Sequence, residues 1–295
     1  MSGVLIRPLR EDDLAALADI TATSYYEVDA RTYQRAWPDP VRRPPARNGA
    51  WIARTRAALT TDPGGCWAAE IDGQVVGGAV SRVRELMWIL ASFAVRPEHQ
   101  GRGIGTELMA AAMHHGRGCL RGMFAASPDP GAVRRYRLAG FDLHPQMMLT
   151  GVVDRSAIPV VDRVREGTAG DVDLMDSVDR RTRGAAHLGD HELLLAQFRL
   201  VVTDHSTGSG YAYVESGGGP YLLAATNRRT ATDLLWETLA ASSPERTVTV
   251  GHITAANEWA VDVGVAARMA LRTEGFLALR HQKPPTPYLP SGHFL

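Results

Sequence analysis

FAVRPEHQGRGIGT, residues 93–106, is the stretch that decides the fold of this chain. A strand-like apolar pattern over residues 86–95 leads into a loop in which Gly101, Gly103 and Gly105 alternate, and a helical pattern follows over residues 108–115. Alternate glycines let the backbone turn tightly and present successive amides without a Cβ in the way. The unpaired amides and positive dipole end of the following helix complete a cradle for phosphate. The stretch therefore predicts a phosphate-binding loop, and a plain strand-to-helix turn is the alternative.

The bulk properties indicate a globular protein with room for two domains. The chain has 295 residues, of which 45% are hydrophobic and 22% charged. Lys+Arg and Asp+Glu both number 32, so no net field favours nucleic acid or a membrane surface as partner. No apolar run reaches the roughly 20 residues of a membrane span. We expect a cytoplasmic protein, a monomer or homodimer, in which Cys66 and Cys119 are unpaired thiols.

The first half alternates strand and helix patterns. The dipeptide Asp72-Gly73 indicates a hairpin, and Gly140 indicates a left-handed cap after a helix. We expect strands over residues 4–9, 66–71, 75–83, 86–95, 120–126 and 141–143, and helices from residue 14 and over residues 25–37, 51–59, 108–115 and 130–138.

This order of elements, with VRPEHQGRGIG at 95–105 and AVRRYRLAGF at 132–141, resembles the GNAT superfamily of acyl-CoA-dependent N-acyltransferases. The resemblance covers roughly residues 4–150. It implies an α/β (α+β) fold, with a mixed, mostly antiparallel twisted sheet flanked by helices. It also implies acetyl-CoA as co-substrate, no metal, and direct attack of an amine on the thioester in a ternary complex.

The resemblance assigns roles to individual residues. Tyr136 matches the general acid that protonates the departing thiolate, since a phenol remains protonated at neutral pH. Asp129 falls near an asparagine that contacts the cofactor, a departure that leaves this contact open. Gln100 occupies the position that opens the phosphate loop. The pyrophosphate would be held by the amides of Gly101, Arg102, Gly103, Ile104, Gly105 and Thr106, and the pantetheine by the backbone of Phe93, Ala94 and Val95.

No residue stands out as the general base. Two positions where the family often places an acid correspond approximately to Ile89 and Phe124. The acids Glu27, Asp29, Glu70 and Glu85 lie in plausible segments, but each is more typical of a solvated surface. A water chain, or an amine that arrives neutral, would serve as well.

The second half, residues 151–295, has the pattern of a degenerate copy of the first. Asn227-Arg228-Arg229-Thr230 stands where a glycine ladder would follow the strand, and Leu271 precedes Gly275 by four residues as Tyr136 precedes Gly140. We expect strands over residues 161–165, 211–215, 221–225, 248–251 and 275–277, and helices over residues 171–183, 192–200, 230–241 and 259–272. This half is interpreted as structural or as a wall of the acceptor pocket.

Three further segments of the chain need an interpretation. Arg228 and Arg229 could bind CoA phosphates at a second site, although paired arginines at a helix start are usually solvated. His114-His115 could suggest a metal, but adjacent positions do not face each other on a helix. The proline-rich tail, residues 284–290, is expected to lie across the domain surface near the acceptor site.

The sequence thus predicts two GNAT-like domains, at residues 1–150 and 151–295. The leading hypothesis is an acetyl-CoA-dependent N-acyltransferase acting on a primary amine of a small molecule or peptide. The alternative is a binding module that senses acyl-CoA without turning it over. A dinucleotide-binding oxidoreductase is disfavoured, because the glycines follow an antiparallel hairpin.

Overall fold

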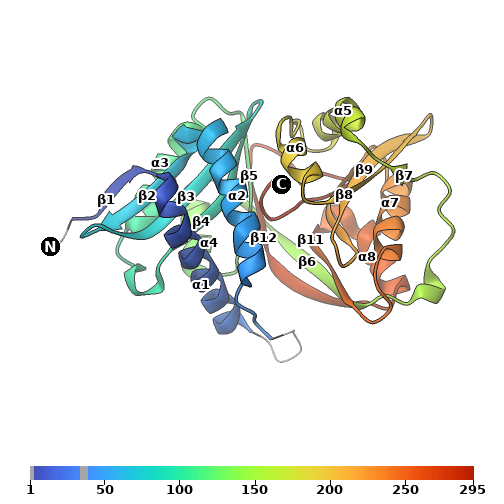
Figure 1. Ribbon diagram of the computed structural model, residues 1–295, viewed down its shortest axis with the longest axis horizontal. Coiled ribbons are helices and arrows are strands. Elements are labelled where there is room, and N and C mark those ends of the chain that lie inside the picture. The colour runs from blue at the N-terminus through green and yellow to red at the C-terminus, as the bar shows by residue number, and fades with distance from the viewer. Residues whose placement is uncertain (1–2, 34–38) are drawn as a thin grey trace. The chain divides into compact units, whose positions relative to one another are not determined.

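The computed structural model describes residues 3–33 and 39–295. It divides into two compact units, Met1–Asp142 and Leu143–Leu295 (Figure 1). The sequence places the division after residue 150, whereas the units part near the start of strand β6 (Asp142–Val152). This strand pairs with β11 (Thr247–Thr254) of the second unit, from Gln146↔Thr254 to Val152↔Thr247.

The sheet of the first unit has the order β1-β2-β3-β4-β5. Its strands are β1 (Leu5–Pro8), β2 (Cys66–Ile71), β3 (Gln74–Arg84), β4 (Met87–Val95) and β5 (Arg121–Ala126). The first four pair antiparallel and β5 pairs parallel to β4. Asp72 and Gly73 have φ of 49° and 76°, which confirms the predicted hairpin because both central residues of such a turn need positive φ.

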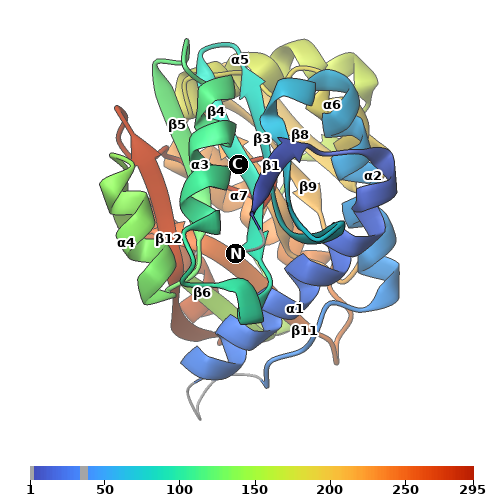
Figure 2. The same ribbon diagram turned by 90° about the vertical axis from the view of Figure 1, so that its left-hand side faces the viewer.

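Four helices flank this sheet. They are α1 (Leu14–Thr32), α2 (Pro45–Thr61), α3 (Ile104–His115) and α4 (Pro130–Leu138). Figure 2 shows α1 and α2 on one side of the sheet and α3 on the other. The prediction of a separate helix over residues 25–37 is wrong up to Thr32, because α1 continues through this segment without a break. The rest of the predicted helix, residues 34–38, lies outside the described residues.

Buried side chains of α1 and α2 hold them on the sheet. Leu14 and Leu17 of α1 and Trp51 and Ala58 of α2 pack with Val80 of β3 in one apolar cluster. Gly78 provides the space for this contact, because a Cβ there would lie 2.6 Å from Leu17. Burying each large side chain of this kind contributes roughly 1.5–3 kcal/mol.

The second unit contains a strand group and a sheet. β12 (Ala270–Arg280), β6 and β11 are neighbours in that order, and the separate sheet has the order β13-β10-β9-β8-β7. The paired strands of this sheet are antiparallel and comprise β7 (Arg165–Glu166), β8 (Arg199–His205), β9 (Gly208–Val214), β10 (Pro220–Ala225) and β13 (Tyr288–Leu289). The helices are α5 (Val172–Thr182), α6 (Asp190–Leu195), α7 (Arg228–Ala240) and α8 (Glu258–Ala266).

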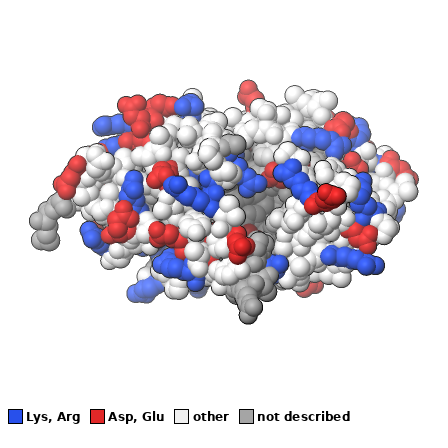
Figure 3. Space-filling model, turned by 60° about the horizontal axis from the view of Figure 1, so that its bottom comes forward, with Lys and Arg blue, Asp and Glu red and all other residues white. Residues whose placement is uncertain are grey.

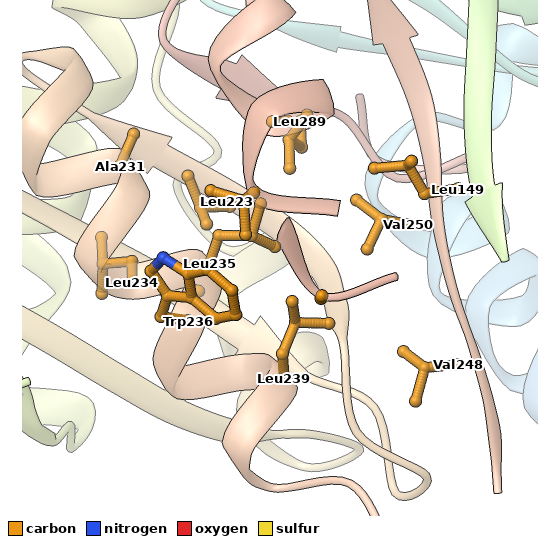
Figure 4. Packing of buried hydrophobic residues seen from close by; sticks show 14 of the residues in the cluster. Leu149, Leu223, Ala231, Leu234, Leu235, Trp236, Leu239, Val248, Val250 and Leu289 are labelled. Carbon is orange, nitrogen blue, oxygen red and sulfur yellow. The ribbon is translucent and has the colours of Figure 1, made fainter. Parts of the chain in front are cut away.

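Helix α7 supplies much of the core of this unit. Leu234, Leu235 and Leu239 are fully buried and belong to the same apolar cluster as Val248 and Val250 of β11 (Figure 4). Short 3₁₀ turns link several elements, at Glu11–Asp13, Pro63–Gly65, Pro97–His99, Arg155–Ala157, Ala169–Asp171 and Ala255–Asn257. The mixed, mostly antiparallel sheets flanked by helices confirm the predicted fold class.

Three predicted elements of the second half are wrong. The helix expected over residues 192–200 is the shorter α6, and strand β8 starts at Arg199. The helix expected over 259–272 ends at Ala266, because Arg268 takes a left-handed φ of 60° and β12 follows. Gly275 therefore lies inside a strand and caps no helix. Residue 161 likewise precedes its strand, which is only Arg165–Glu166.

The proline-rich tail is part of the sheet. Tyr288 and Leu289 form β13 against β10, and both side chains are buried. Asn257 clamps the segment, since its side-chain oxygen accepts from the amide of Tyr288 at 3.0 Å and its nitrogen donates to the carbonyl of Pro285 at 3.0 Å. The expectation of a segment lying across the surface is wrong, because apolar burial and strand pairing outweigh its extended character.

Candidate functional site

The glycine loop leaves the start of α3 open. Gly101 and Gly103 have φ of 76° and 88°, a region that side chains with a Cβ rarely adopt. Gly103 is the N-cap of α3 and provides no side-chain cap. The amide of Thr106 donates to the carbonyl of Gly103 at 2.8 Å. Within residues 3–33 and 39–295, no acceptor satisfies the amides from Gly101 to Gly105, so this end of α3 is suited to an anion.

Gln100 fixes the base of the loop. Its Nε2 donates to the carbonyl of Val95 at 2.9 Å, which ties the loop to the end of β4. The side chains of Arg102 and Thr106 are exposed. Both side chains are therefore accessible from solvent, while the amide of Thr106 is already used within the helix start.

Strand β4 has a free edge beside the loop. It pairs with β5 only at Met87, Trp88 and Ile89, and no pairing continues to Val95 in the described part of the chain. The hydroxyl of Tyr25, on α1, lies 3.4 Å from the amide nitrogen and 3.5 Å from the carbonyl oxygen of Phe93. The backbone groups of Phe93 thus point to this edge, where an extended ligand could add as a strand.

The directions of the backbone groups of Ala94 and Val95 follow from the alternation along β4. Ala94 is opposite Gly78 of β3, and Val95 shares the side of Phe93 because successive residues point their backbone groups to opposite edges. The carbonyl of Val95 already accepts from Ser24 Oγ at 3.1 Å and from Gln100. Phe93 is therefore the residue whose backbone groups a ligand could take over most readily.

Tyr136 faces this edge from α4. Its side chain is 6% exposed, with ring centroids 4.6 Å from Phe124 and 6.4 Å from Phe93. Burial raises the pKa of Tyr136, so the phenol keeps its proton at neutral pH and can serve as a donor.

Asp129 is engaged within the protein. One carboxylate oxygen caps α4 by accepting from the amide of Ala132 at 2.9 Å, and the other accepts from Arg31 at 2.9 Å. The carboxylate thus joins the N-terminus of α4 to α1. Its predicted contact with a cofactor stays a prediction.

The acidic candidates for the general base lie on β2, on α1 and in the turn between β3 and β4. Ile89 and Phe124 are fully buried, and Glu70 pairs with Arg7 at 2.7 Å on the β1–β2 side of the sheet. Glu85 lies in the β3–β4 turn with φ of 52°. Glu27 is half-buried and Asp29 exposed on α1.

Sequence reasoning missed Tyr25 and Arg135 at this site. Tyr25 reaches Phe93 across 68 positions of sequence, and no spacing signals such a contact. Arg135 directly precedes Tyr136, and its guanidinium carbon lies 5.8 Å from the centroid of the Phe93 ring. An arginine in the middle of a partly buried helix face was the available signal for it.

The corresponding helix start in the second unit is closed. Asn227 caps α7, because its Oδ1 accepts from the amide of Thr230 at 2.9 Å. Arg228 and Arg229 are exposed. The helix cap equivalent to Gly140 is Arg268, so the residue four positions earlier is Gly264 and the predicted counterpart, Leu271, is wrong.

A group of buried titratable residues lies elsewhere in the second unit. Ligand atoms of Asp179, His187 and His191 lie within 4.8 Å of one another. His187 Nδ1 is 2.7 Å from Asp179 Oδ2, and Arg183 bonds the other ring nitrogen. Because a guanidinium only donates, Nε2 of His187 accepts and Nδ1 carries the proton. Both nitrogens are thus used in a hydrogen-bonded network, which leaves His187 no lone pair for a metal.

Charges give no further indication of a partner. Figure 3 shows acidic and basic side chains interspersed on the face that it draws. Cys66 and Cys119 form no disulfide, as expected, and burial raises the pKa of Cys66 to about 12. No described helix is long and apolar enough to cross a membrane.

The first unit thus has an uncapped glycine loop after a strand with a free edge, and comparison with known families indicates its class. Residues 22–141 match the model of the acetyltransferase (GNAT) family. This match lies within the first unit and ends at residue 141. No curated protein matches the sequence significantly.

Solved structures share the fold over nearly the whole chain. A protein from Pyrococcus horikoshii that is assigned as an acetyltransferase has a TM-score of 0.74 and 19% identity, covering 100% of this chain and 96% of its own. GCN5-related N-acetyltransferases from Kribbella flavida and Sphaerobacter thermophilus have TM-scores of 0.58 and 0.57 at 16% and 15% identity. They cover 94% and 95% of this chain, and 70% and 96% of their own. These similarities show that the fold of the chain is shared with these proteins.

Proposed function

We propose that the protein is an N-acyltransferase that transfers the acyl group of an acyl-CoA, with acetyl-CoA as the donor, to a primary amine. One observation carries the proposal: the uncapped start of α3 directly follows the free edge of β4. A ligand that combines an anionic pyrophosphate with an extended amide-bearing arm would satisfy both features. CoA is such a ligand.

Each part of the site then has a task. The amides of the loop from Gly101 to Gly105 bind the pyrophosphate, and the pantetheine adds along the edge formed by Phe93 and Val95. To admit it, Tyr25 gives up its bonds to the backbone of Phe93. The Phe93 amide is then free to polarise the thioester carbonyl, which stabilises the developing oxyanion.

The transfer is direct. The amine nitrogen attacks the thioester carbon, the new C–N bond forms, and the C–S bond breaks after the tetrahedral intermediate. The departing thiolate takes the proton of the Tyr136 hydroxyl. The amine nitrogen loses a proton to water in the site. Water in turn returns a proton to the Tyr136 phenolate, so that no net proton is consumed.

Two substitutions test these roles in the full-length chain. Gly103→Val forces a β-branched residue to a φ of 88° and should abolish thermal stabilisation by acetyl-CoA. Gly73→Val is the matched control, because Gly73 has a φ of 76° in the distant hairpin with nothing within 4 Å of its Cβ position. Both variants should lose stability, but only Gly103→Val should lose the response to ligand.

Tyr136→Phe tests the acid. It should lower kcat by roughly 10²–10⁴-fold while CoA affinity is retained. Thiol release from acetyl-CoA is measured against a broad panel of amines. An unchanged rate in the variant would leave Tyr136 as a packing residue. If the wild-type chain binds acetyl-CoA and releases thiol with no amine in the panel, the sensing module is the better interpretation.

A further inference from the structure

Arg135 lies on the phosphate loop although it belongs to α4. A Cβ built on Gly105, in the first turn of α3, would lie 2.9 Å from the guanidinium carbon of Arg135 and 3.1 Å from both Nη atoms. The same guanidinium carbon is 5.8 Å from the centroid of the Phe93 ring. The side chain thus reaches from α4 to the point where the loop meets the free edge of β4.

Positive charge gathers where Arg135 meets the loop. An arginine side chain stays protonated in proteins, and the start of α3 adds the positive end of a helix dipole. Nε of Arg135 is buried with no hydrogen-bond partner among the described residues. The acid at the start of α4, Asp129, is paired with Arg31. Two positive groups therefore adjoin, and no described acidic residue forms an ion pair with Arg135. An anion between the two groups would turn their repulsion into attraction.

From this geometry we infer that Arg135 binds the diphosphate bridge of the CoA donor together with the loop amides. The inference rests on the proposed function and adds a donor-binding residue to it. The planar fork of a guanidinium matches two phosphate oxygens, and here it would hold the diphosphate while its hydrocarbon stem follows the wall beside Phe93.

The inference also explains the third glycine of the loop. Gly105 is not among the residues with positive φ, so its backbone conformation does not require glycine. Its lack of a Cβ instead leaves the space that the guanidinium occupies. Gly101 and Gly103 are needed for conformation, whereas Gly105 is needed for room.

Binding of three ligands to the full-length chain tests this role. Isothermal titration is performed with CoA, with dephospho-CoA, which lacks the 3′-phosphate but keeps the diphosphate, and with acetylpantetheine, which has neither. Arg135→Gln should weaken CoA and dephospho-CoA equally, by roughly 10- to 100-fold, and leave acetylpantetheine unchanged. Arg135→Lys should recover part of the loss, because it keeps the charge without the fork.

The matched control is Arg134→Gln. Arg134 is the exposed neighbour on the same helix, so removing its charge should change CoA affinity less than about twofold. The salt dependence of CoA binding should also be shallower in Arg135→Gln than in the wild type, because one phosphate contact is lost.

Several outcomes would overturn the inference. If Arg135→Gln loses affinity for CoA but not for dephospho-CoA, Arg135 contacts the 3′-phosphate and not the diphosphate. An equal loss for acetylpantetheine would make it a packing partner of Phe93, and tighter CoA binding would show that it blocks the site. If Arg135→Gln does not fold, equal salt dependence for CoA and acetylpantetheine in the wild type refutes a charged contact. Absence of any CoA binding by the wild type would instead refute the proposed function itself.

Discussion

The buried network of the second unit makes stability dependent on pH in a direction that can be worked out. Burial, together with the charge of Arg183, lowers the pKa of His187 from 6.5 to about 4. The side chains of His187 and Asp179 are both fully buried. In the unfolded chain the imidazole takes up a proton near pH 6.5, but in the folded protein it resists protonation until about pH 4. Acid therefore stabilises the unfolded state first, and stability falls as the pH drops through this window.

The magnitude follows from the two pKa values. Between pH 7.5 and pH 4.5, this one group should reduce the free energy of unfolding by about 2.5 kcal/mol. Asp179 adds little above pH 4.5. Burial opposes its ionisation, but its neighbours His187, His191 and Arg183 hold the pKa of Asp179 below its ordinary value, so its own contribution is lost only at lower pH.

The assay compares the wild type with His187→Gln. Glutamine can accept from Arg183 and donate to Asp179 but does not titrate, so the variant should lose roughly 2–3 kcal/mol less than the wild type between these pH values. Hydrogen exchange of the α5 amides, corrected for intrinsic exchange rates, measures the free energy of unfolding of the second unit separately from that of the first. His205→Gln, at an exposed position, is the control and should behave as the wild type. Equal pH dependence in wild type and His187→Gln would refute the buried, neutral imidazole.

Three other predictions concern the first unit and the number of sites. Asp62→Asn should lower the free energy of unfolding, measured in urea titrations, by about 3 kcal/mol. The reason is that Asp62 pairs with the buried Arg84 at 2.9 Å, and a loss below about 1 kcal/mol would mean that the pair is solvated. Tyr25→Phe should tighten CoA binding by roughly 2- to 5-fold, since the weak bonds to the Phe93 backbone no longer compete, and weaker binding would show that the hydroxyl contacts the ligand. Calorimetry should give one CoA per chain, whereas two would indicate a second site at Arg228.

The elements that sequence predicted well are those with a local cause. Asp72-Gly73 requires a hairpin by its dihedral angles, and the pattern of Gly101, Gly103 and Gly140 requires left-handed turns at these points. Such signals do not depend on the rest of the fold. The backbone turns of the glycine loop and the cap after α4 could therefore be placed from residue types alone.

The errors arise where distant parts of the chain decide the structure. α8 and β12 form one continuous apolar pattern, and it is the left-handed Arg268, with no glycine to signal it, that separates them. The tail from Pro285 becomes strand β13 because Asn257 and β10 satisfy its backbone. The contact of Tyr25 with Phe93 likewise depends on how α1 lies on the sheet. None of these partners is close in sequence.

The contrast between α3 and α7 supports the proposed donor site. Both helices follow a strand, and every helix start has four amides that need acceptors. In α7, Asn227 supplies an acceptor from its own side chain, a contribution of typically about 1 kcal/mol. In α3, Gly103 leaves that place empty, and Arg135 adds a positive charge beside it. A fold that needed only stability would cap both helices. The first unit forgoes this stabilisation at a helix start that follows the free edge of β4, and a bound diphosphate would return it.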